Sequence, residues 1–293
     1  MGHSNKKKKL TANQQIDKRL SSICKFGESR DRYKQYNNDS KYIFSHRTKQ
    51  NYFKAMRHLF FYCKEKYGIK DVRDCEQYVN EYIQDCRNRN LSSYTQKSYL
   101  SAFRKYYDSS FSDVVTDSRA RSKIKRSRYD TKRARNFSIE NNRDLIDFCK
   151  STGLRRSELE TLTGGDTKVY FDEKGDAYIS GVKGKGGKVR DVRILANNPN
   201  VIRKIKNTAA DQPVWGTVHS AANIHGYRAD YAQALYKSVA RPAGQLKQEE
   251  KYICQRDMAG VVFDRKAMKI VSESLGHNRI GIVAQNYLYN FEN

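Results

Sequence analysis

The chain has 293 residues, of which 38% are hydrophobic, so it is long enough for one large or two ordinary domains with a buried core. Its 57 lysines and arginines against 32 acidic residues give a formal net charge of +25, which favours a polyanionic partner, usually nucleic acid, over a ribosomal or nonspecifically basic protein. No apolar run reaches the length of a membrane span, and six cysteines without zinc-type spacing fit a reducing cytoplasm, so we expect a cytoplasmic protein without a metal, nucleoid-associated if prokaryotic.

The N-terminal part is predicted to be helical. Residues 1–40 form an arm with one short helix, because apolar residues recur at helical spacing over only one short stretch. Residues 41–118 form a helical domain, since three apolar stripes with helical spacing follow one another, the first ending at Gly68. The opposite faces carry basic side chains, among them Lys97 and Arg104, which would face either phosphates or plain solvent.

A dense basic run follows over residues 119–136, opposed only by Asp130 and without any hydrophobic period. Self-repulsion keeps such a run extended until an anion neutralises it. We expect an interdomain linker lying along a DNA backbone and releasing a counterion for each phosphate that it neutralises. Its basic residues are Arg119, Arg121, Lys123, Lys125, Arg126, Arg128, Lys132, Arg133 and Arg135.

Residues 137–293 are predicted to form a second, mixed domain. After two helices the apolar period changes to two, which predicts three strands over 169–171, 177–182 and 189–195. After Pro213 the chain is predicted to be mostly helical. The fold class is therefore α+β and mainly α, with a small three-stranded sheet in the second domain.

Arg155 stands in the motif Thr-Gly-Leu-Arg-Arg-Ser-Glu-Leu, directly after a glycine-containing turn. Glu158 lies three residues further on the same helical face, where it can hold the guanidinium. Arg156 points about 100° away around the helix, so only one of the two arginines can face a given phosphate. An ordinary surface Arg–Glu pair would give the same local pattern.

Four further side chains have chemistry that suits a phosphate. His225 and Arg228 are three residues apart and would share a helix face, so that one handles a proton while the other grips the phosphate. His277 follows Leu-Gly, where a capping or packing histidine is the plain alternative, and Tyr287 comes ten residues later. A phenol becomes a nucleophile when its proton leaves or nearby cations stabilise the phenolate.

Lys185 lies at the tip of a predicted glycine-rich hairpin, in the run Gly-Lys-Gly-Gly-Lys. It could bring an ammonium group to a leaving oxygen as a general acid, although Lys183 and Lys188 compete for this role and an ordinary basic turn has the same composition. Breaking a phosphodiester without a metal needs fixed cations, a proton donor, a proton acceptor and a nucleophile. This set of side chains supplies all four.

The order, spacing and types of these residues resemble the tyrosine recombinases, also called phage-type integrases. The resemblance runs from about residue 45 to the end, and it selects Arg155 over Arg156 and Lys185 over its neighbours. It implies a helical core-binding domain and a catalytic domain of the kind shared with type IB topoisomerases. It also implies cutting and rejoining of double-stranded DNA through a Holliday junction, by a homotetramer on two DNA sites with a dimer on each, without cofactor, metal or ATP.

The resemblance assigns a role to each residue. Tyr287 would attack the phosphate to form a 3′-phosphotyrosyl bond and free a 5′ hydroxyl. Arg155, Arg228 and His277 would stabilise the transition state. Lys185 would be the general acid, and His225 would assist proton transfer.

Two features depart from the family pattern. The 48 residues between Arg228 and His277 exceed the usual spacing, and residues 242–265 are predicted to be an inserted element that contacts either DNA or another subunit. Only six residues follow Tyr287, so subunits would interlock through other surfaces. The alternatives are relaxation of DNA by a type IB topoisomerase-like enzyme and a catalytically inactive DNA-binding regulator.

Overall fold

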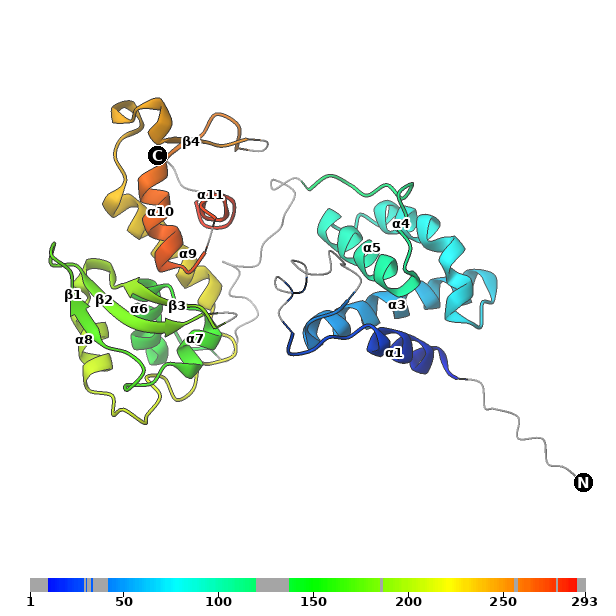
Figure 1. The fold of residues 1–293 in the computed structure, drawn as a ribbon, viewed down its shortest axis with the longest axis horizontal. Coiled ribbons are helices and arrows are strands. Elements are labelled where there is room, and N and C mark those ends of the chain that lie inside the picture. The colour runs from blue at the N-terminus through cyan, green and yellow to red at the C-terminus, as the bar shows by residue number, and fades with distance from the viewer. Residues whose placement is uncertain are drawn as a thin grey trace, which may run out of the picture. The chain divides into compact units, whose positions relative to one another are not determined.

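The chain divides into two compact units, Met1–Ile124 and Lys125–Asn293, whose elements are drawn in Figure 1. Each unit is described by itself. The computed structural model describes residues 10–28, 30, 33, 42–119, 137–184, 187–255, 258–277 and 279–288.

The regular elements described in the first unit are helices, apart from an isolated bridge between Cys24 and Ile43. It contains α1 (Ala12–Ser22), α3 (His46–Tyr67), the 3-10 turn η1 (Val72–Tyr78), α4 (Val79–Asn88) and α5 (Ser93–Tyr107). The predicted helices are confirmed, and α1 packs on α3 so that its apolar side chains share one core with the other helices.

The ends of these helices follow from local chemistry. Ser45 caps α3 by accepting a hydrogen bond from the backbone N–H of Thr48, and Ser92 caps α5 by accepting one from Thr95. Gly68 ends α3 with a φ of 67°, a left-handed conformation that glycine adopts without a steric cost.

The second unit combines a small antiparallel sheet with helices, as predicted. The strands β1 (Val169–Phe171), β2 (Ala177–Lys183) and β3 (Val189–Arg193) lie in the order β1-β2-β3, and Val182 of β2 pairs with Arg190 of β3. The strand β3 ends earlier than expected because Leu195–Asn197 forms a 3-10 turn, η6.

Helices α8 (Pro199–Lys206) and α10 (Arg265–Ser274) pack against this sheet, and further helices extend the second unit. The further helices are η5 (Glu140–Asn142), α6 (Arg143–Thr152), α7 (Arg156–Thr161), α9 (Ile224–Val239), η7 (Ala243–Gln245), η8 (Gln248–Glu250) and α11 (Gly281–Asn286). The unit has two hydrophobic clusters, one that includes Leu154 beside the sheet and one that begins at Ala229 in α9. Arg155 and Arg228 are the chain neighbours of these two residues, so the candidate site lies where the clusters adjoin.

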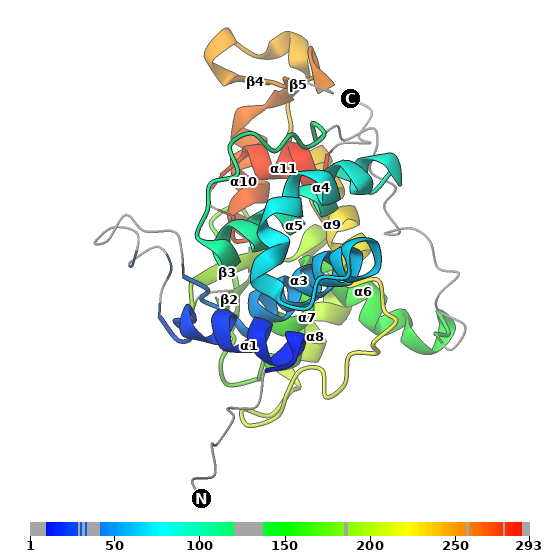
Figure 2. The ribbon, with the colours of Figure 1, turned by 90° about the vertical axis from the view of Figure 1, so that its right-hand side faces the viewer.

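The stretch 242–265 contains a second sheet that the sequence did not predict. The strands β4 (Lys251–Ile253) and β5 (Val262–Asp264) pair antiparallel, and Figure 2 shows them side by side. Arg241 anchors this element through Asp264, at 2.9 Å, and through Glu250, at 2.6 Å. The sequence predicted mostly helix after Pro213, and the apolar residues of these two strands are adjacent rather than alternating.

Candidate active site

Arg155 and Arg156 have separate surroundings. Arg155 precedes α7 in an extended conformation, and its Nη1 donates to Oε1 of Glu158 at 2.6 Å while its backbone N–H donates to Oε2 at 2.8 Å. Arg156 donates instead to the backbone carbonyls of Val218, His219 and Ala222, at 2.9 to 3.0 Å. Arg156 therefore fastens the loop before α9, whereas Arg155 faces the candidate site.

A second arginine holds the same carboxylate. Arg190, on β3, donates from Nη1 to Oε1 of Glu158 at 3.1 Å and from Nη2 to Oε2 at 2.8 Å. Burial alone would raise the pKa of Glu158, but the paired Arg190 and Arg155 outweigh it and lower that pKa to about 2. Glu158 is 2% exposed and is therefore an ionised carboxylate buried between two guanidinium groups.

Sequence reasoning missed Arg190. Strand β3 has a period of two, and Arg190 occupies the same face as Val192, which is fully buried. A cation at an inward position of a strand needs a buried anion as its partner. The alternation of β3 was therefore the signal that could have identified Arg190, and Glu158 is the buried anion that pairs with it.

The C-terminal end of α10 binds three arginines. Gly276, with a φ of 66°, donates from its N–H to Glu273 and His277 donates to Ser272, both at 2.8 Å, in the pattern that commonly ends helices. The backbone carbonyls of Ser274 and Leu275, which follow Glu273, accept hydrogen bonds from guanidinium groups instead. Ser274 accepts from Nε of Arg190 at 2.9 Å, and Leu275 accepts from Arg155 at 3.2 Å and from Arg228 at 2.5 Å.

These contacts have an electrostatic reason. The C-terminal carbonyls of a helix carry partial negative charge, so cations are stabilised there. The Leu-Gly-His motif therefore fixes the backbone of His277 and aims two carbonyls at the arginines. It positions four functional side chains with one helix end.

Arg228, on α9, is the most deeply buried of these cations, with 1% of the residue exposed. Its Nε donates to Oη of Tyr287 at 3.1 Å, and its Nη1 donates to the carbonyl of Gly153. Burial lowers the pKa of Arg228, and the nearby charge of Arg155 lowers it further. The site thus holds a guanidinium in contact with the phenol.

Gly153 is needed at the end of α6 for two reasons. Its φ is 60°, and a Cβ atom there would lie 2.2 Å from Cδ1 of Tyr231, a buried side chain of α9. Tyr231 in turn donates from its hydroxyl to the carbonyl of Arg193 at 2.8 Å. The close approach of α6 to α9 brings the Gly153 carbonyl within reach of Arg228.

His277 and Tyr287 meet beside this guanidinium. Nε2 of His277 is 3.2 Å from Oη of Tyr287 and 3.5 Å from Nη2 of Arg228. Arginine can only donate, so these contacts favour the tautomer in which Nε2 carries no proton and accepts. Burial and the charges of Arg228 and then Arg155 lower the pKa of His277 to about 4, so its ring is neutral at pH 7. Nε2 is therefore free of a proton and can accept a hydrogen bond from the phenol.

Tyr287 directly follows α11 and is 8% exposed. Its backbone N–H donates to Val283 at 2.9 Å, and its carbonyl accepts from Nε2 of Gln233 at 2.9 Å. Two backbone contacts thus fix the base of the side chain, and Arg228 and His277 fix its oxygen. The structure brings together four of the six predicted catalytic side chains.

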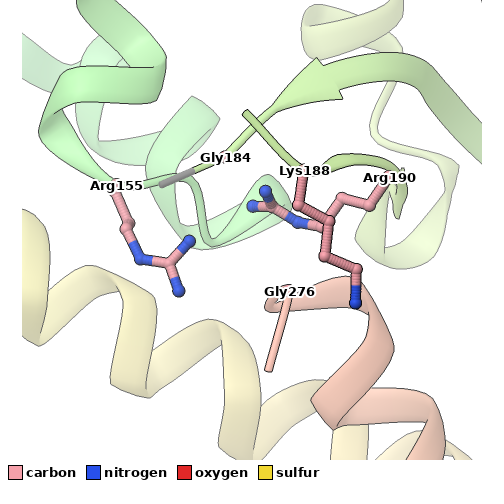
Figure 3. A pocket seen from close by; sticks show the side chains of 5 residues that line it. All are labelled: Arg155, Gly184, Lys188, Arg190 and Gly276. Atoms are coloured by element: carbon pink, nitrogen blue, oxygen red, sulfur yellow. The ribbon is translucent and has the colours of Figure 1, made fainter. Parts of the chain in front are cut away.

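The structure does not bring Lys185 or His225 into contact with these four side chains among the residues and contacts that it describes. Lys185 lies outside the described residues, and His225 is exposed in the first turn of α9. Of the competing lysines, Lys183 pairs with Asp166 at 3.6 Å on the surface, whereas Lys188 lines a pocket. Figure 3 shows this pocket, in which the guanidinium groups of Arg155 and Arg190 point toward one another and Lys188, Gly184 and Gly276 complete the lining.

The predicted DNA-binding residues are mostly outside the described parts of the chain. Lys97 is half-buried on α5, and Arg104 donates to the carbonyl of Ser110 at 2.6 Å, beyond the end of that helix. Arg119 lies over the ring of Tyr94, 4.7 Å from its centroid. Those that lie in the stretch not described are Arg121, Lys123, Lys125, Arg126, Arg128, Lys132, Arg133 and Arg135.

Neither metal ligands nor a membrane helix was found in what the structure describes. Within those residues, no three His, Cys, Asp or Glu side chains are grouped so that they could hold a metal ion. None of the described helices combines the length and the apolar character that crossing a bilayer requires.

The comparisons with known proteins returned only solved structures. No family model matches the sequence, and no curated protein matches it. The structure of the Tn1549 transposon integrase in complex with transposon right end DNA is 15% identical, with 93% of this chain and 94% of that chain covered and a TM-score of 0.45. The same integrase in complex with a circular intermediate DNA is 15% identical over 95% of both chains, with a TM-score of 0.44.

Proposed function

We propose that this chain cuts and rejoins DNA as a tyrosine-type site-specific recombinase in which Tyr287 is the nucleophile. One observation carries the proposal. The phenol oxygen lies 3.1 Å from a buried guanidinium nitrogen and 3.2 Å from the ring nitrogen of a histidine that is neutral at pH 7. A guanidinium that stabilises a phenolate and a base that takes its proton are what turn a weak phenol into a nucleophile.

The reaction balances without any further reagent. Oη of Tyr287 forms a bond to phosphorus, its proton passes to Nε2 of His277, and the bond from phosphorus to the 5′ oxygen breaks. The leaving oxygen takes a proton from a lysine of the hairpin between β2 and β3, for which the family resemblance selects Lys185, with His225 assisting proton transfer. The products are a 3′-phosphotyrosyl bond and a 5′ hydroxyl, and attack by another 5′ hydroxyl reverses the steps.

Arg155 and Arg228 would stabilise the charge that builds on the non-bridging oxygens. Both share the carbonyl of Leu275, and Glu158 also holds Arg155, so their positions are fixed before any DNA binds. A fixed donor needs no reorganisation at the moment of reaction, and removing one such donor typically slows catalysis by about 100- to 1000-fold.

The rest of the chain fits a clamp on double-stranded DNA. Residues 41–118 would be the core-binding domain and 137–293 the catalytic domain, joined by the basic run 119–136 along the DNA backbone. The net charge of +25 supports DNA as the partner. A homotetramer on two sites in the cytoplasm, exchanging strands of a mobile element through a Holliday junction, completes the proposal.

Covalent trapping tests the nucleophile. Genomic DNA from the source of the chain is incubated with the protein, the mixture is denatured, and protein-linked fragments are sequenced to locate the cleavage site. A duplex with a nick beside that site then loses its short 5′-hydroxyl strand after cleavage, which prevents rejoining. Wild type is expected to accumulate a covalent adduct, and Tyr287→Phe none despite retained binding; adduct formation by that variant would reject the assignment.

A plasmid with two copies of the mapped site tests the type of reaction. Recombination deletes or inverts the intervening segment, whereas a topoisomerase-like enzyme relaxes supercoils without exchange. We expect exchanged products that depend on both sites. Relaxation of a plasmid with one site, without exchange in the two-site plasmid, would favour the topoisomerase.

A further inference from the structure

The carboxylate of Glu158 accepts four hydrogen bonds, two from Arg155 and two from Arg190. The side chain of Glu158 is 2% exposed and that of Arg190 7%, whereas that of Arg155 is 22% exposed and lines the pocket. The carboxylate is therefore shared between one nearly buried cation and one that solvent or a ligand can reach.

The net charge of these side chains shows why it matters that two arginines share the carboxylate of Glu158. Arg155 and Glu158 alone form a neutral pair, and a neutral pair attracts a phosphate weakly. With Arg190 the three groups carry one net positive charge, and Arg228 adds a second. Charges interact strongly where water is largely excluded, so the count at this site has more effect than it would at a surface.

We propose that Arg190 is a positioning residue that offsets the negative charge of Glu158, so that Arg155 stays fixed by this carboxylate yet keeps its full attraction for a phosphate. The inference rests on the proposed function, because the phosphate is that of the DNA. Glu158 has two effects on Arg155, since it holds the guanidinium in place and its negative charge opposes that of the guanidinium. Arg190 would remove the second effect and leave the first.

The surroundings of Arg190 are built for this role. Its three nitrogens donate to Ser274 and to both oxygens of Glu158, so the plane of the guanidinium is set by protein groups. Gly276 makes room for it, because a Cβ atom there would lie 2.9 Å from Cδ of Arg190. Any larger residue at this position would displace the side chain that neutralises Glu158.

A competing interpretation is that Arg190 grips the phosphate directly, since it also lines the pocket. The two interpretations differ in what happens when the charge of Glu158 is removed. If Arg190 acts by offsetting this charge, then Glu158→Gln must restore part of what Arg190→Met loses. If Arg190 binds phosphate itself, removing the glutamate charge restores nothing.

The experiment measures the rate of covalent adduct formation on the nicked duplex, at saturating DNA, for wild type, Arg190→Met, Glu158→Gln and the double variant. We expect Arg190→Met to be slower by about 100-fold, as for loss of one fixed donor to the transition state. The double variant is expected to recover at least about tenfold relative to Arg190→Met. A double variant no faster than Arg190→Met, or Arg190→Met at the wild-type rate, would overturn the inference.

Two further variants guard against a structural artefact. Arg193→Met removes another cation from the same strand, one that pairs with Asp176 away from the pocket, and it is expected to keep the wild-type rate. Arg190→Lys keeps the positive charge and is expected to stay within about tenfold of wild type. If Arg190→Met does not fold, loss of more than about 100-fold in Arg190→Lys rejects the inference, because charge alone would then not suffice.

A second measurement does not depend on catalysis. Inorganic phosphate, compared with chloride at equal ionic strength, is expected to raise the midpoint of thermal unfolding most for wild type, least for Arg190→Met, and to an intermediate degree for the double variant. Failure of wild type to form any adduct would reject the proposed function while this order still supports the charge balance. An equal phosphate effect in wild type and Arg190→Met would reject the charge balance itself.

Discussion

The low pKa of His277 predicts a specific loss of stability in mild acid. An ordinary histidine has a pKa of 6.5, whereas that of His277 is about 4 in the folded chain because burial and the neighbouring arginines disfavour its charged form. Below pH 6.5 the unfolded chain therefore binds a proton at this position that the folded chain does not. Folding stability must fall as the pH decreases from about 6.5 to 4, and level off below that.

The magnitude follows from the difference of about 2.5 pH units. Each pH unit is worth about 1.4 kcal/mol, so full burial would give roughly 3.4 kcal/mol. Because the ring is partly exposed and solvent screens its charge interactions, we expect about half of this, roughly 1.7 kcal/mol. The carboxylate of Glu158, with a pKa lowered to about 2, loses its contribution only as the pH falls from 4.5 toward 2, which is a separate window.

The assay is urea unfolding of wild type and His277→Gln at several pH values between 7.5 and 4.5. The free energy of unfolding of wild type is expected to fall by about 1.4 kcal/mol more than that of the variant over this range, which covers most of the window between pH 6.5 and 4. Subtracting the two curves cancels the contributions of the other five histidines, which both proteins share. Parallel curves would refute the claim that burial and the neighbouring arginines keep His277 neutral below pH 6.5.

Gly153→Ala is expected to lower the free energy of unfolding by about 3 kcal/mol, because it combines left-handed backbone strain with a clash against Tyr231. Gly175→Ala should cost only about 1 kcal/mol, because Gly175 has a similar φ of 78° but no atom within 4 Å of the added Cβ. Equal losses in urea unfolding would contradict the close packing at Gly153. Lys185→Ala should slow cleavage of an ordinary duplex but not of a duplex whose leaving 5′ oxygen is replaced by sulfur, because a leaving thiolate needs no proton donor. Lys188→Ala should cleave both duplexes at the wild-type rate. The opposite pattern would assign the general acid to Lys188. Replacing three arginines of residues 119–136 by glutamine should reduce the slope of log affinity for DNA against log salt by about 2 to 3, and an unchanged slope would show that this run does not lie on phosphates.

Much of the fold could be predicted from the sequence because its signals are local. Gly68 stands at the helix end that the sequence predicted, and the change of apolar period from 3.6 to two located the strands around Ile179 and Val192. The hairpin of β4 and β5 was missed because the apolar residues of each short strand, Tyr252-Ile253 and Val262-Phe263, are adjacent rather than alternating.

The candidate site was predicted only in part, since its side chains converge through contacts distant in the sequence. The order of motifs indicated Arg155, Arg228, His277 and Tyr287, and the structure brings these together. Arg190 has no motif of its own. Its function depends on a carboxylate 32 residues away and on the backbone carbonyl of a helix end, which no local pattern records.

Tyr287 is tested as the nucleophile by identifying the amino acid that carries the DNA. Protease digestion of the trapped covalent adduct, followed by nuclease trimming and mass spectrometry, locates the nucleotide on one peptide. We expect a 3′-phosphoryl nucleotide on the phenol oxygen of Tyr287. A nucleotide attached to any other side chain, or through a 5′ phosphate, would contradict this expectation.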